Sequence, residues 1–339
     1  WSVHADSKAI GLATLSQMVQ SIPAHEGRAV AGINGDFYQR DKAYAGDPRG
    51  LQVVGGQFLS APIGGVGFWI DAEGQPHAGT ISNAFRITWP GGASQPFGLN
   101  EERRSDRLVL YTQLMGANSR TPAGREFVLE SATNTPLGGL PVDETIQVRV
   151  RSIRTAGATP IEPNTWVLSA SPNLARALPT IEPGALLTLA TATIPPIRGA
   201  RTAISGGPLL VHQGQAQKIQ SPKSESYEFS SMLERHPRSA VGWNQDYFFL
   251  TLVDGRQPKL SVGMTLGELG EYMARLGCDE AINLDGGGSA TLWCAGAIRN
   301  SPCDGRERPA EERLEVAVLG LSCHRESLRR GNAGTTVEQ

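Results

Sequence analysis

The sequence predicts an α+β fold in which mixed β-sheets are packed by a few helices. Glycine (40) and proline (22) are abundant among the 339 residues and only 6% are aromatic, which favours turns and short strands over a helical bundle. Short apolar runs separated by Gly, Pro and Asn fill the middle of the chain. We expect residues 1–325 to form one domain with a β-rich subregion at 81–200, followed by a polar tail at 326–339.

Charge and hydrophobicity exclude two classes of partner. The chain has 31 Lys and Arg against 33 Asp and Glu, a net charge of −2, and no block of basic residues. It therefore lacks the phosphate attraction of a nucleic-acid binder. No run of about eighteen apolar residues is present, so we expect no membrane span.

The first predicted elements are a helix and a buried strand. Residues 12–22 begin with a capping box, in which Thr14 is followed three residues later by Gln17. Apolar side chains then recur at helical spacing, and Pro23 ends the helix. Residues 28–34 are too short and too evenly apolar for a surface helix, so we expect a buried strand that leads into a polar loop.

The middle region has the pattern of antiparallel strands. Residues 85–89 and 146–153 alternate between apolar and polar side chains, as half-buried strands do. Residues 130–144 carry no periodicity, and we expect a hairpin tip there. No segment repeats at a fixed period, which argues against a propeller or a solenoid.

A strand, a helix and a second strand follow one another across residues 247–285. The helix begins with a capping box formed by Thr265 and Glu268. Two strands joined by a crossover helix are usually parallel, so their carboxyl ends lie at one edge of the sheet. A further apolar strand is expected at 314–322.

Carboxylates follow directly on both strands of this βαβ unit. Asp254 follows the first strand and Asp285 the second. If the strands are adjacent, their ends lie about 4.8 Å apart, which brings the carboxylates within the range that glycosidic chemistry uses. Open sheets bind ligands beyond the carboxyl ends of their strands. Asn34 and Asp36 end the earlier strand and can join the same site.

A glycine-rich loop and two arginines complete the candidate site. Residues 286–289 allow positive φ and let backbone N–H groups approach an anion, although a plain glycine turn capped by Asp285 is the alternative. Arg256 and Arg238 could hold phosphate oxygens by paired hydrogen bonds, or could be solvated charges. His236 could act as an acid or base, although a single loop histidine is more often structural.

The four cysteines suggest disulfides, because none forms the CxxC pair of a zinc site. Cys294 and Cys303 bracket a short segment that could close as a bridged loop. Cys278 opens one apolar strand and Cys323 ends another, so they meet if those strands pair antiparallel. The alternative is four unpaired thiols in a cytosolic protein.

Six motifs, in order along nearly the whole chain, resemble those of the phosphodiester glycosidase family. The glycine-rich motif after VDGRQP and a helix is the most specific. The motifs are INGDFY (33–38), LVLYTQ (108–113), ISGGPLLVHQG (204–214), RHPRSAVG (235–242), VDGRQPKLSVGMTLGELGEYMARLGCDEAINLDGGGSATLW (253–293) and RERPAEE (306–312).

The resemblance implies a secreted or periplasmic hydrolase that acts on a carbohydrate or glycosyl-phosphate substrate. It would cleave a sugar-1-phosphodiester, similar to N-acetylglucosamine-1-phosphate, at the sugar–phosphate bond and leave a phosphomonoester. We expect no cofactor and no metal. Which aspartate attacks, and whether configuration is retained, stays open.

We assign the site residues by role. They are Asp285 and Asp254 for catalysis; Arg256, Arg238, Gly286, Gly287, Gly288 and Ser289 for the phosphate; and Asn34, Asp36, Asn283 and Gly207 for the sugar.

The chain departs from the family pattern at two positions. Asp36 stands where a glycine is commoner and adds an acceptor or cation ligand, and Ala290 removes a hydroxyl. Two other functions therefore stay open. One is a glycoside hydrolase that cuts an ordinary glycosidic bond in a polysaccharide, and the other is a carbohydrate-binding envelope protein without turnover.

Overall fold

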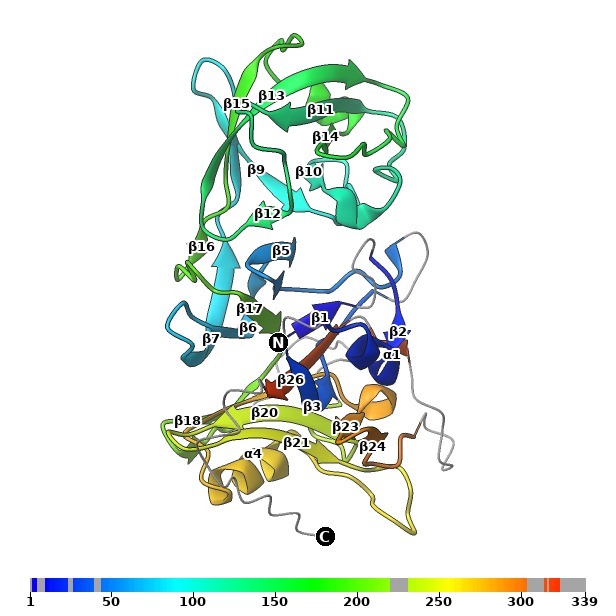
Figure 1. The fold of residues 1–339 in the computed structure, drawn as a ribbon, viewed down its shortest axis with the longest axis vertical. Helices are drawn as coiled ribbons and strands as arrows, with labels where there is room; N and C mark the ends of the chain where they lie inside the picture. The colour runs from blue at the N-terminus through cyan, green and yellow to red at the C-terminus, as the bar shows by residue number, and fades with distance from the viewer. Residues whose placement is uncertain are drawn as a thin grey trace.

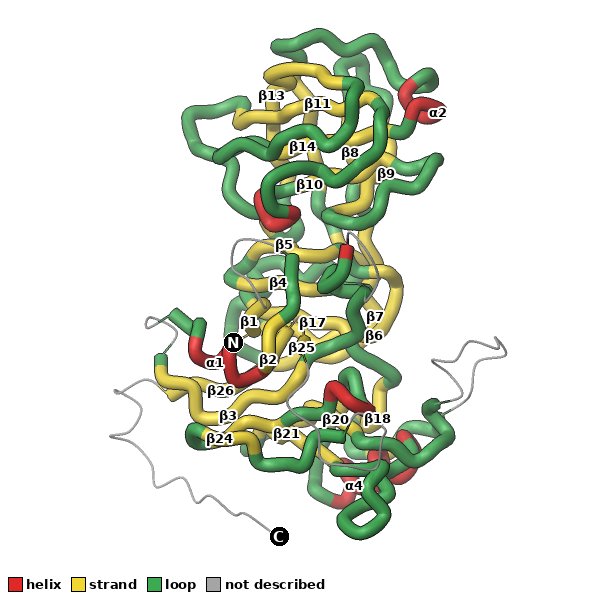
Figure 2. Tube along the Cα trace, turned by 90° about the vertical axis from the view of Figure 1, so that its right-hand side faces the viewer, coloured by secondary structure: helices red, strands yellow, loops and turns green. Residues whose placement is uncertain are grey.

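The computed structural model describes residues 2–4, 10–23, 27–39, 44–219, 231–303, 314–315 and 317–323. The molecule is elongated, with a closed β-barrel at one end, a large sheet in the middle and two stacked sheets at the other end (Figure 1). The view turned by 90° shows the same three levels (Figure 2). Strands predominate and helices are few, so the structure is mostly β-sheet with a few packing helices, which agrees broadly with the predicted α+β class. In these ranges, no helix has the length and apolar character that a bilayer crossing requires.

The barrel contains most of the strand-rich middle region. Its core is filled by alternate side chains, such as Val148 and Val150, while their neighbours point outward, as the period-two pattern predicts. The order around the barrel is β10-β14-β11-β13-β15-β8-β9. The strands are β8 (Arg86–Thr88), β9 (Ser94–Leu99), β10 (Leu108–Tyr111), β11 (Arg125–Ser131), β13 (Thr145–Arg154), β14 (Trp166–Ala170) and β15 (Leu186–Ala190).

A seven-stranded sheet connects the barrel to the rest of the molecule. Ala203 shares the core of the barrel strands, whereas its neighbour Ile204 faces the core of the stacked sheets. The order is β12-β5-β4-β17-β6-β7-β16. The strands are β4 (Gln52–Val54), β5 (Gln57–Ser60), β6 (Ile63–Ile70), β7 (Pro76–Asn83), β12 (Leu140–Pro141), β16 (Thr193–Ile194) and β17 (Thr202–Ser205).

The two remaining five-stranded sheets pack face to face. One has the order β1-β26-β3-β23-β24 and the other β19-β18-β22-β20-β21. Ile33 from the first meets Val241 and Ile282 from the second in a shared core. The strands are β1 (Ser2–His4), β3 (Arg28–Asn34), β18 (Leu209–His212), β19 (Gln215–Ala216), β20 (Arg238–Trp243), β21 (Phe248–Val253), β22 (Glu280–Asn283), β23 (Leu292–Cys294), β24 (Ala297–Ile298) and β26 (Ala317–Cys323).

A helix covers each outer face of this pair of sheets. Both helices begin with the predicted capping box: α1 (Leu15–Gln20) at Thr14 and α4 (Leu266–Arg275) at Thr265. The α1 side chains pack on the sheet of β3, and those of α4 on the sheet of β20. The short elements are β2 (Ala13–Thr14), which pairs with β25 (Leu314–Glu315), α2 (Pro172–Ala175), η3 (Gln113–Met115) and η4 (Gly287–Ser289).

The βαβ unit differs from the prediction in one respect. β21 and β22 both run antiparallel to β20, so they are parallel to each other as expected. However, β20 lies between them. Their ends are therefore two strand spacings apart, about 9.6 Å, rather than one. Hydrophobic periodicity along the chain does not reveal that β20 lies between β21 and β22.

The predicted disulfides do not form, because Cys278, Cys294 and Cys303 are all free. Cys294 ends β23 and turns directly into β24, whereas the Cys303 thiol donates to the carbonyl oxygen of Arg256 at 3.7 Å. Cys278 precedes β22, and Cys323 ends β26 in the other stacked sheet, so those strands do not pair. The side chain of Cys323, the predicted tail at 326–339 and the motif at 306–312 lie outside the described residues.

Candidate active site

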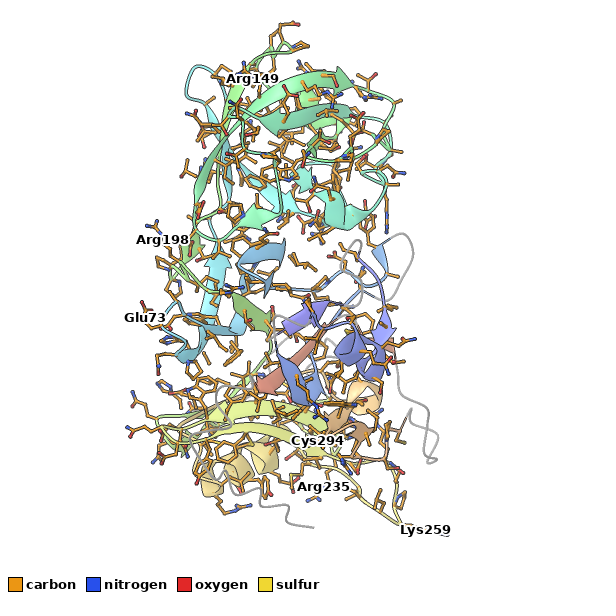
Figure 3. The ribbon with its side chains drawn as sticks, viewed as in Figure 1. Glu73, Arg149, Arg198, Arg235, Lys259 and Cys294 are labelled. Carbon is orange, nitrogen blue, oxygen red and sulfur yellow. The ribbon has the colours of Figure 1, made fainter. Side chains whose placement is uncertain are left out.

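Several chain segments that are distant in sequence meet at one edge of the stacked sheets. β20 runs antiparallel to β21 and β22, so its first residue, Arg238, lies where those two strands end. β18 begins beside the end of β22, which brings the turn at 205–208 to the same edge. In Figure 3, Arg235 and Lys259, from loops of this edge, lie far from Arg149 on the barrel.

Asp285 is attached to the end of β3 by two hydrogen bonds. Its N–H donates to the carbonyl oxygen of Gly35 (3.1 Å), and Nδ2 of Asn34 donates to its carbonyl oxygen (2.7 Å). Oδ1 of Asn34 accepts from the hydroxyl of Ser239 (2.6 Å) and the N–H of Thr291 (3.1 Å). Asn34, predicted to bind the sugar, is therefore fully buried and engaged in holding the Asp285 loop.

Asp36 is the carboxyl group on which the charge of Asp285 acts. Burial raises the pKa of Asp36 to about 7, and the negative charge of Asp285 adds to the rise. The N–H of Phe37, the hydroxyl of Ser205 and the charge of Arg49 act in the opposite direction. The side chain is only 9% exposed. The chain thus places a carboxyl that titrates near neutral pH close to a second carboxylate.

Asp254 has a different environment from the one expected. Its Oδ1 accepts from the N–H of Ser301 (3.0 Å) and from Nδ2 of Asn300 (3.3 Å). The same amide of Asn300 donates to the carbonyl oxygen of Ala290 (3.0 Å). Asp254 therefore ties the 300–301 segment to the loop that follows Asp285.

Arg256 lies against the glycine-rich loop, as the prediction requires. A Cβ atom on Gly287 would lie 3.1 Å from Nη2 of Arg256, and φ at Gly287 is +62°. Nε of Arg256 donates to Nδ1 of His236 (3.2 Å). Burial and the charges of Arg256 and Arg238 lower the pKa of His236, which favours the neutral ring that can accept this bond.

Arg238 points into the protein rather than toward a ligand. Its guanidinium donates to the carbonyl oxygens of Met264 (2.9 Å), Ser231 (2.6 Å) and Glu234 (2.7 Å). Arg238 is 5% exposed. Its burial, and to a smaller extent the positive charge of Arg256, lower its pKa to about 10. Arg238 therefore connects the loop at 231–234 to the residue Met264, which precedes α4.

The glycine-rich loop uses part of its backbone on the protein itself. The N–H of Gly287 donates to the carbonyl oxygen of Pro237 (2.8 Å), and that of Ser289 to Gly286 (3.2 Å). These two groups are not directed at an anion, unlike the nest that was predicted. Gly288 and Ser289 are buried, and within the described ranges the Ser289 hydroxyl has no hydrogen-bond partner.

Asn283 and Gly207 hold each other at the end of β22. Nδ2 of Asn283 donates to the carbonyl oxygen of Gly207 (3.0 Å), and the N–H of Gly207 donates to that of Asn283 (2.7 Å). Oδ1 of Asn283 is buried and accepts no hydrogen bond from the described part of the chain. It is therefore an acceptor that a ligand hydroxyl could satisfy.

Sequence reasoning missed four residues of this edge. Ser239 orients Asn34, and Asn300 orients Asp254. The charge of Arg49 lowers the pKa of Asp36, and Gly50 is the fourth residue. A Cβ on Gly50 would lie 2.2 Å from Oγ of Ser205, so a side chain there would displace the Asp36 partner. Arg49, Gly50 and Asn300 are common residue types outside the quoted motifs, so no sequence signal distinguishes them, whereas Ser239 lies in the motif at 235–242 and could have been singled out there. Across the described ranges, no group of three or more His, Cys, Asp or Glu is placed to hold a metal ion.

Comparison with known families gives one match over much of the chain. A model of the phosphodiester glycosidases matches residues 123–317. The matched segment includes Arg256, Asp285 and the glycine-rich loop, whereas Asp36 precedes it.

Comparison with individual proteins gives more distant likenesses. The "SPbeta prophage-derived uncharacterized protein YomE" of Bacillus subtilis is 30% identical over 121 residues, which are 35% of this chain and 18% of that protein. A hypothetical protein from Synechocystis has a TM-score of 0.70 at 21% identity, covering 94% of this chain and 55% of that one. A "Putative exported protein" from Burkholderia pseudomallei has a TM-score of 0.70 at 22% identity, covering 95% and 71%. At these identities the structures share the fold.

Proposed function

Since the chain belongs to the phosphodiester glycosidase family, we propose that it hydrolyses a sugar-1-phosphodiester at the sugar–phosphate bond. The bond between the anomeric carbon and the phosphate oxygen breaks, and water supplies the hydroxyl that replaces it. The second proton of the water goes to the leaving phosphate or to solvent. The products are the free sugar, of the N-acetylglucosamine class, and a phosphomonoester.

The pairing of Asp36 with Asp285 is the observation that carries this proposal. Both residues are buried; Asp36 titrates near pH 7, and Asp285 supplies a negative charge that contributes to this rise. Two carboxyl groups in different environments are the usual acid and base of glycoside cleavage. We propose that Asp285 acts at the anomeric carbon, where the bond to the phosphate oxygen breaks, and that Asp36 transfers the proton. Asp254, which we had assigned to catalysis, takes a positioning role.

Arg256 is the cation we assign to the phosphate. Arg256 follows Asp254 by two residues and lies against the glycine-rich loop. The hydrogen bond from its Nε to His236 orients the guanidinium. A phosphodiester leaves as a stabilised anion, so a guanidinium can take over part of the work of a general acid. Asn283 would accept a sugar hydroxyl through Oδ1.

The test uses a methyl phosphodiester of N-acetylglucosamine-1-phosphate in ¹⁸O-labelled water. We expect sugar and methyl phosphate in equal amounts and no label in the methyl phosphate, because the C–O bond breaks. Asp285→Asn and Asp36→Asn should each lower kcat/KM about 100-fold or more. Asp246→Asn, an exposed aspartate in the turn at the other end of β20, is the matched control. Label in the methyl phosphate would show P–O cleavage and refute the proposal.

One observation favours the other enzymatic function. Arg238 donates its hydrogen bonds to backbone carbonyls, which leaves Arg256 as the one arginine assigned to the phosphate. A substrate without phosphate would need no arginine in the site. An aryl N-acetylglucosaminide tests this alternative. Faster cleavage of the aryl glycoside than of the phosphodiester, unaffected by Arg256→Gln, would support a glycosidase that cuts ordinary glycosidic bonds.

We also propose that the protein works outside the cytoplasm. The Burkholderia pseudomallei protein of similar fold is named a "Putative exported protein", and the glycosyl substrate proposed here fits an envelope or secreted location. Fractionation of source cells with antibody detection tests this, since recovery in the cytoplasmic fraction alone would contradict it.

A further inference from the structure

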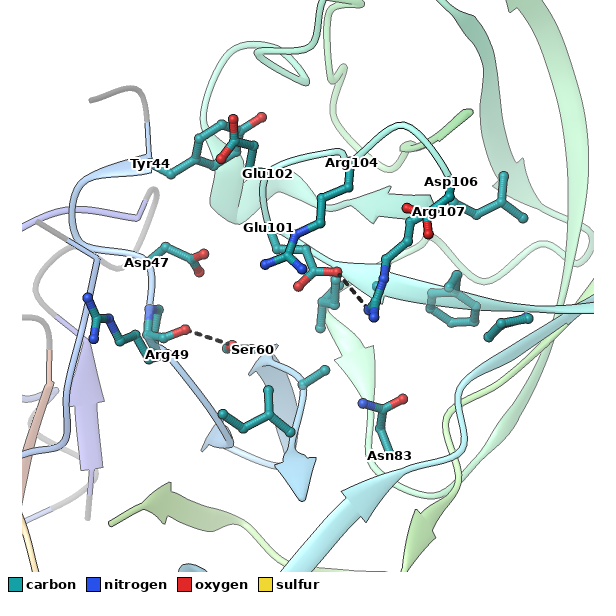
Figure 4. A pocket seen from close by; sticks show the side chains of 18 of the residues that line it. Tyr44, Asp47, Arg49, Ser60, Asn83, Glu101, Glu102, Arg104, Asp106 and Arg107 are labelled. Atoms are coloured by element: carbon teal, nitrogen blue, oxygen red, sulfur yellow. Dashed lines mark hydrogen bonds and ion pairs between the residues drawn. The ribbon is translucent and has the colours of Figure 1, made fainter. Parts of the chain in front are cut away.

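A cavity of about 800 Å³ lies between the barrel and the segment that leads to the central sheet. Figure 4 shows Glu101, Arg104 and Arg107 entering from the barrel, opposite Asp47 and Ser60. The volume lies within the roughly 300–1,000 Å³ of small-molecule sites. A space of this size lined by side chains from two parts of the fold is large enough for several sugar rings.

The cavity is separate from the candidate active site. The two are divided by the segment in which Tyr38 pairs with Pro48, with Asp36 on the side of Ser205 and Asp47 facing the cavity. The side chain of Arg49 points away from the cavity in Figure 4, which agrees with its action on Asp36. Apart from Arg49, whose charge acts on Asp36, the lining side chains have no part in the proposed hydrolysis.

Two buried acceptors in the cavity wall have no partner among the described residues. They are Oδ1 of Asp47 and Oε1 of Gln95. Buried polar atoms are nearly always hydrogen-bonded, and leaving one unsatisfied is destabilising. A ligand that offers hydroxyl donors would satisfy both.

The charges in the wall nearly balance. Arg104 and Arg107 share the wall with the carboxyls of Glu101, Glu102, Asp106 and Asp47, whereas the Arg49 guanidinium points away. Glu101 and Arg107 form an ion pair at 4.0 Å, and burial, with the charge of Glu101, raises the pKa of Asp47 to about 8. At neutral pH Asp47 is therefore mostly protonated, and the two arginines face three remaining carboxylates, so the wall has no positive surplus to attract an anionic ligand.

We propose that this cavity is a second binding site, for an uncharged oligosaccharide, because its buried acceptors require hydroxyl donors and its wall has no positive surplus that would bind an anion. Arginine, carboxyl and amide groups in the wall supply both the donors and the acceptors that sugar hydroxyls bind.

Titration calorimetry on the full chain at pH 7 tests the site with maltotetraose, cellotetraose and chitotetraose as probes. We expect one of them to bind and tetragalacturonate to bind more weakly. Gln95→Ala and Asp47→Ala should each weaken binding about tenfold, whereas Asp47→Asn keeps the acceptor oxygen and should retain it. Unchanged circular dichroism identifies variants that still fold.

The Asp285→Asn variant distinguishes this site from the active site. Tetrasaccharide binding that persists in Asp285→Asn supports a separate site, whatever the result of the hydrolysis assay. If none of the three neutral probes binds, or if Asp285→Asn abolishes binding while Gln95→Ala does not, the cavity is not the saccharide site and the inference is wrong.

Discussion

Asp36 shows how much a single side chain depends on what surrounds it. An aspartate in water has a pKa near 3.8, whereas burial here moves it to about 7. The N–H of Phe37, the hydroxyl of Ser205 and the charge of Arg49 limit the rise. Asp36 therefore has the protonation behaviour that the proposed chemistry needs.

The stability of the protein should fall with pH because of Asp36. The folded state holds this proton more tightly than the unfolded chain, so folding is favoured below about pH 4 and the advantage is lost as pH rises to about 7. Asp36→Asn removes the titration. Urea unfolding should show the variant more stable than wild type at pH 8, by at most about 4 kcal/mol, with the difference shrinking toward pH 4. Equal differences at both pH values would contradict this account.

Asn34 should tolerate no change in its hydrogen-bonding groups. In Asn34→Asp, an oxygen replaces the amide that donates to the carbonyl oxygens of Asp285 and Gly35. Acceptors would then face one another in a fully buried position, and we expect a loss of about 2–4 kcal/mol in the free energy of unfolding. Asn134→Asp, at an exposed position, is the matched control. A loss below 1 kcal/mol would mean that Asn34 does not hold the Asp285 loop.

Among the elements, α4 supports the sheet from whose strand ends the candidate site is built. Its Leu266, Leu269 and Met273 pack against the face of the sheet that contains β18, β20 and β22. These strands carry the polar residues of the site at their ends, so the helix fixes the sheet from which the loops extend. The Thr265 and Glu268 capping box defines where the helix begins.

Thr265→Ala should destabilise the protein by about 1 kcal/mol, because the N–H of Glu268 loses its acceptor. Thr265→Ser keeps the hydroxyl and should lose much less. Thermal unfolding of both variants against wild type measures the difference. Equal melting temperatures for the serine and alanine variants would show that the cap contributes nothing.

At the scale of the whole molecule, sheet order decides which residues meet. The insertion of β20 separates the ends of β21 and β22, and the placement of Cys278 and Cys323 in different sheets prevents the predicted pairing. The assignment of residues 1–325 to one domain and 326–339 to a tail stays a prediction.

Thiol titration tests the corrected cysteine arrangement. In denaturant without reductant, at least three thiols per chain should react, at Cys278, Cys294 and Cys303. The melting temperature should be the same with and without dithiothreitol, because no crosslink constrains the unfolded chain. Two or fewer reactive thiols would indicate that a disulfide forms after all.

The sequence by itself determined the local features of this protein. Capping boxes at Thr14 and Thr265, period-two strands in the barrel and the glycine-rich loop after Asp285 all follow from interactions between near neighbours. Only the tertiary structure decided that Asp36 lies near Asp285, that Asp254 binds Ser301, and that Arg238 turns inward. These contacts depend on strand order and burial, which are set by packing between distant segments and leave no periodic trace in the sequence.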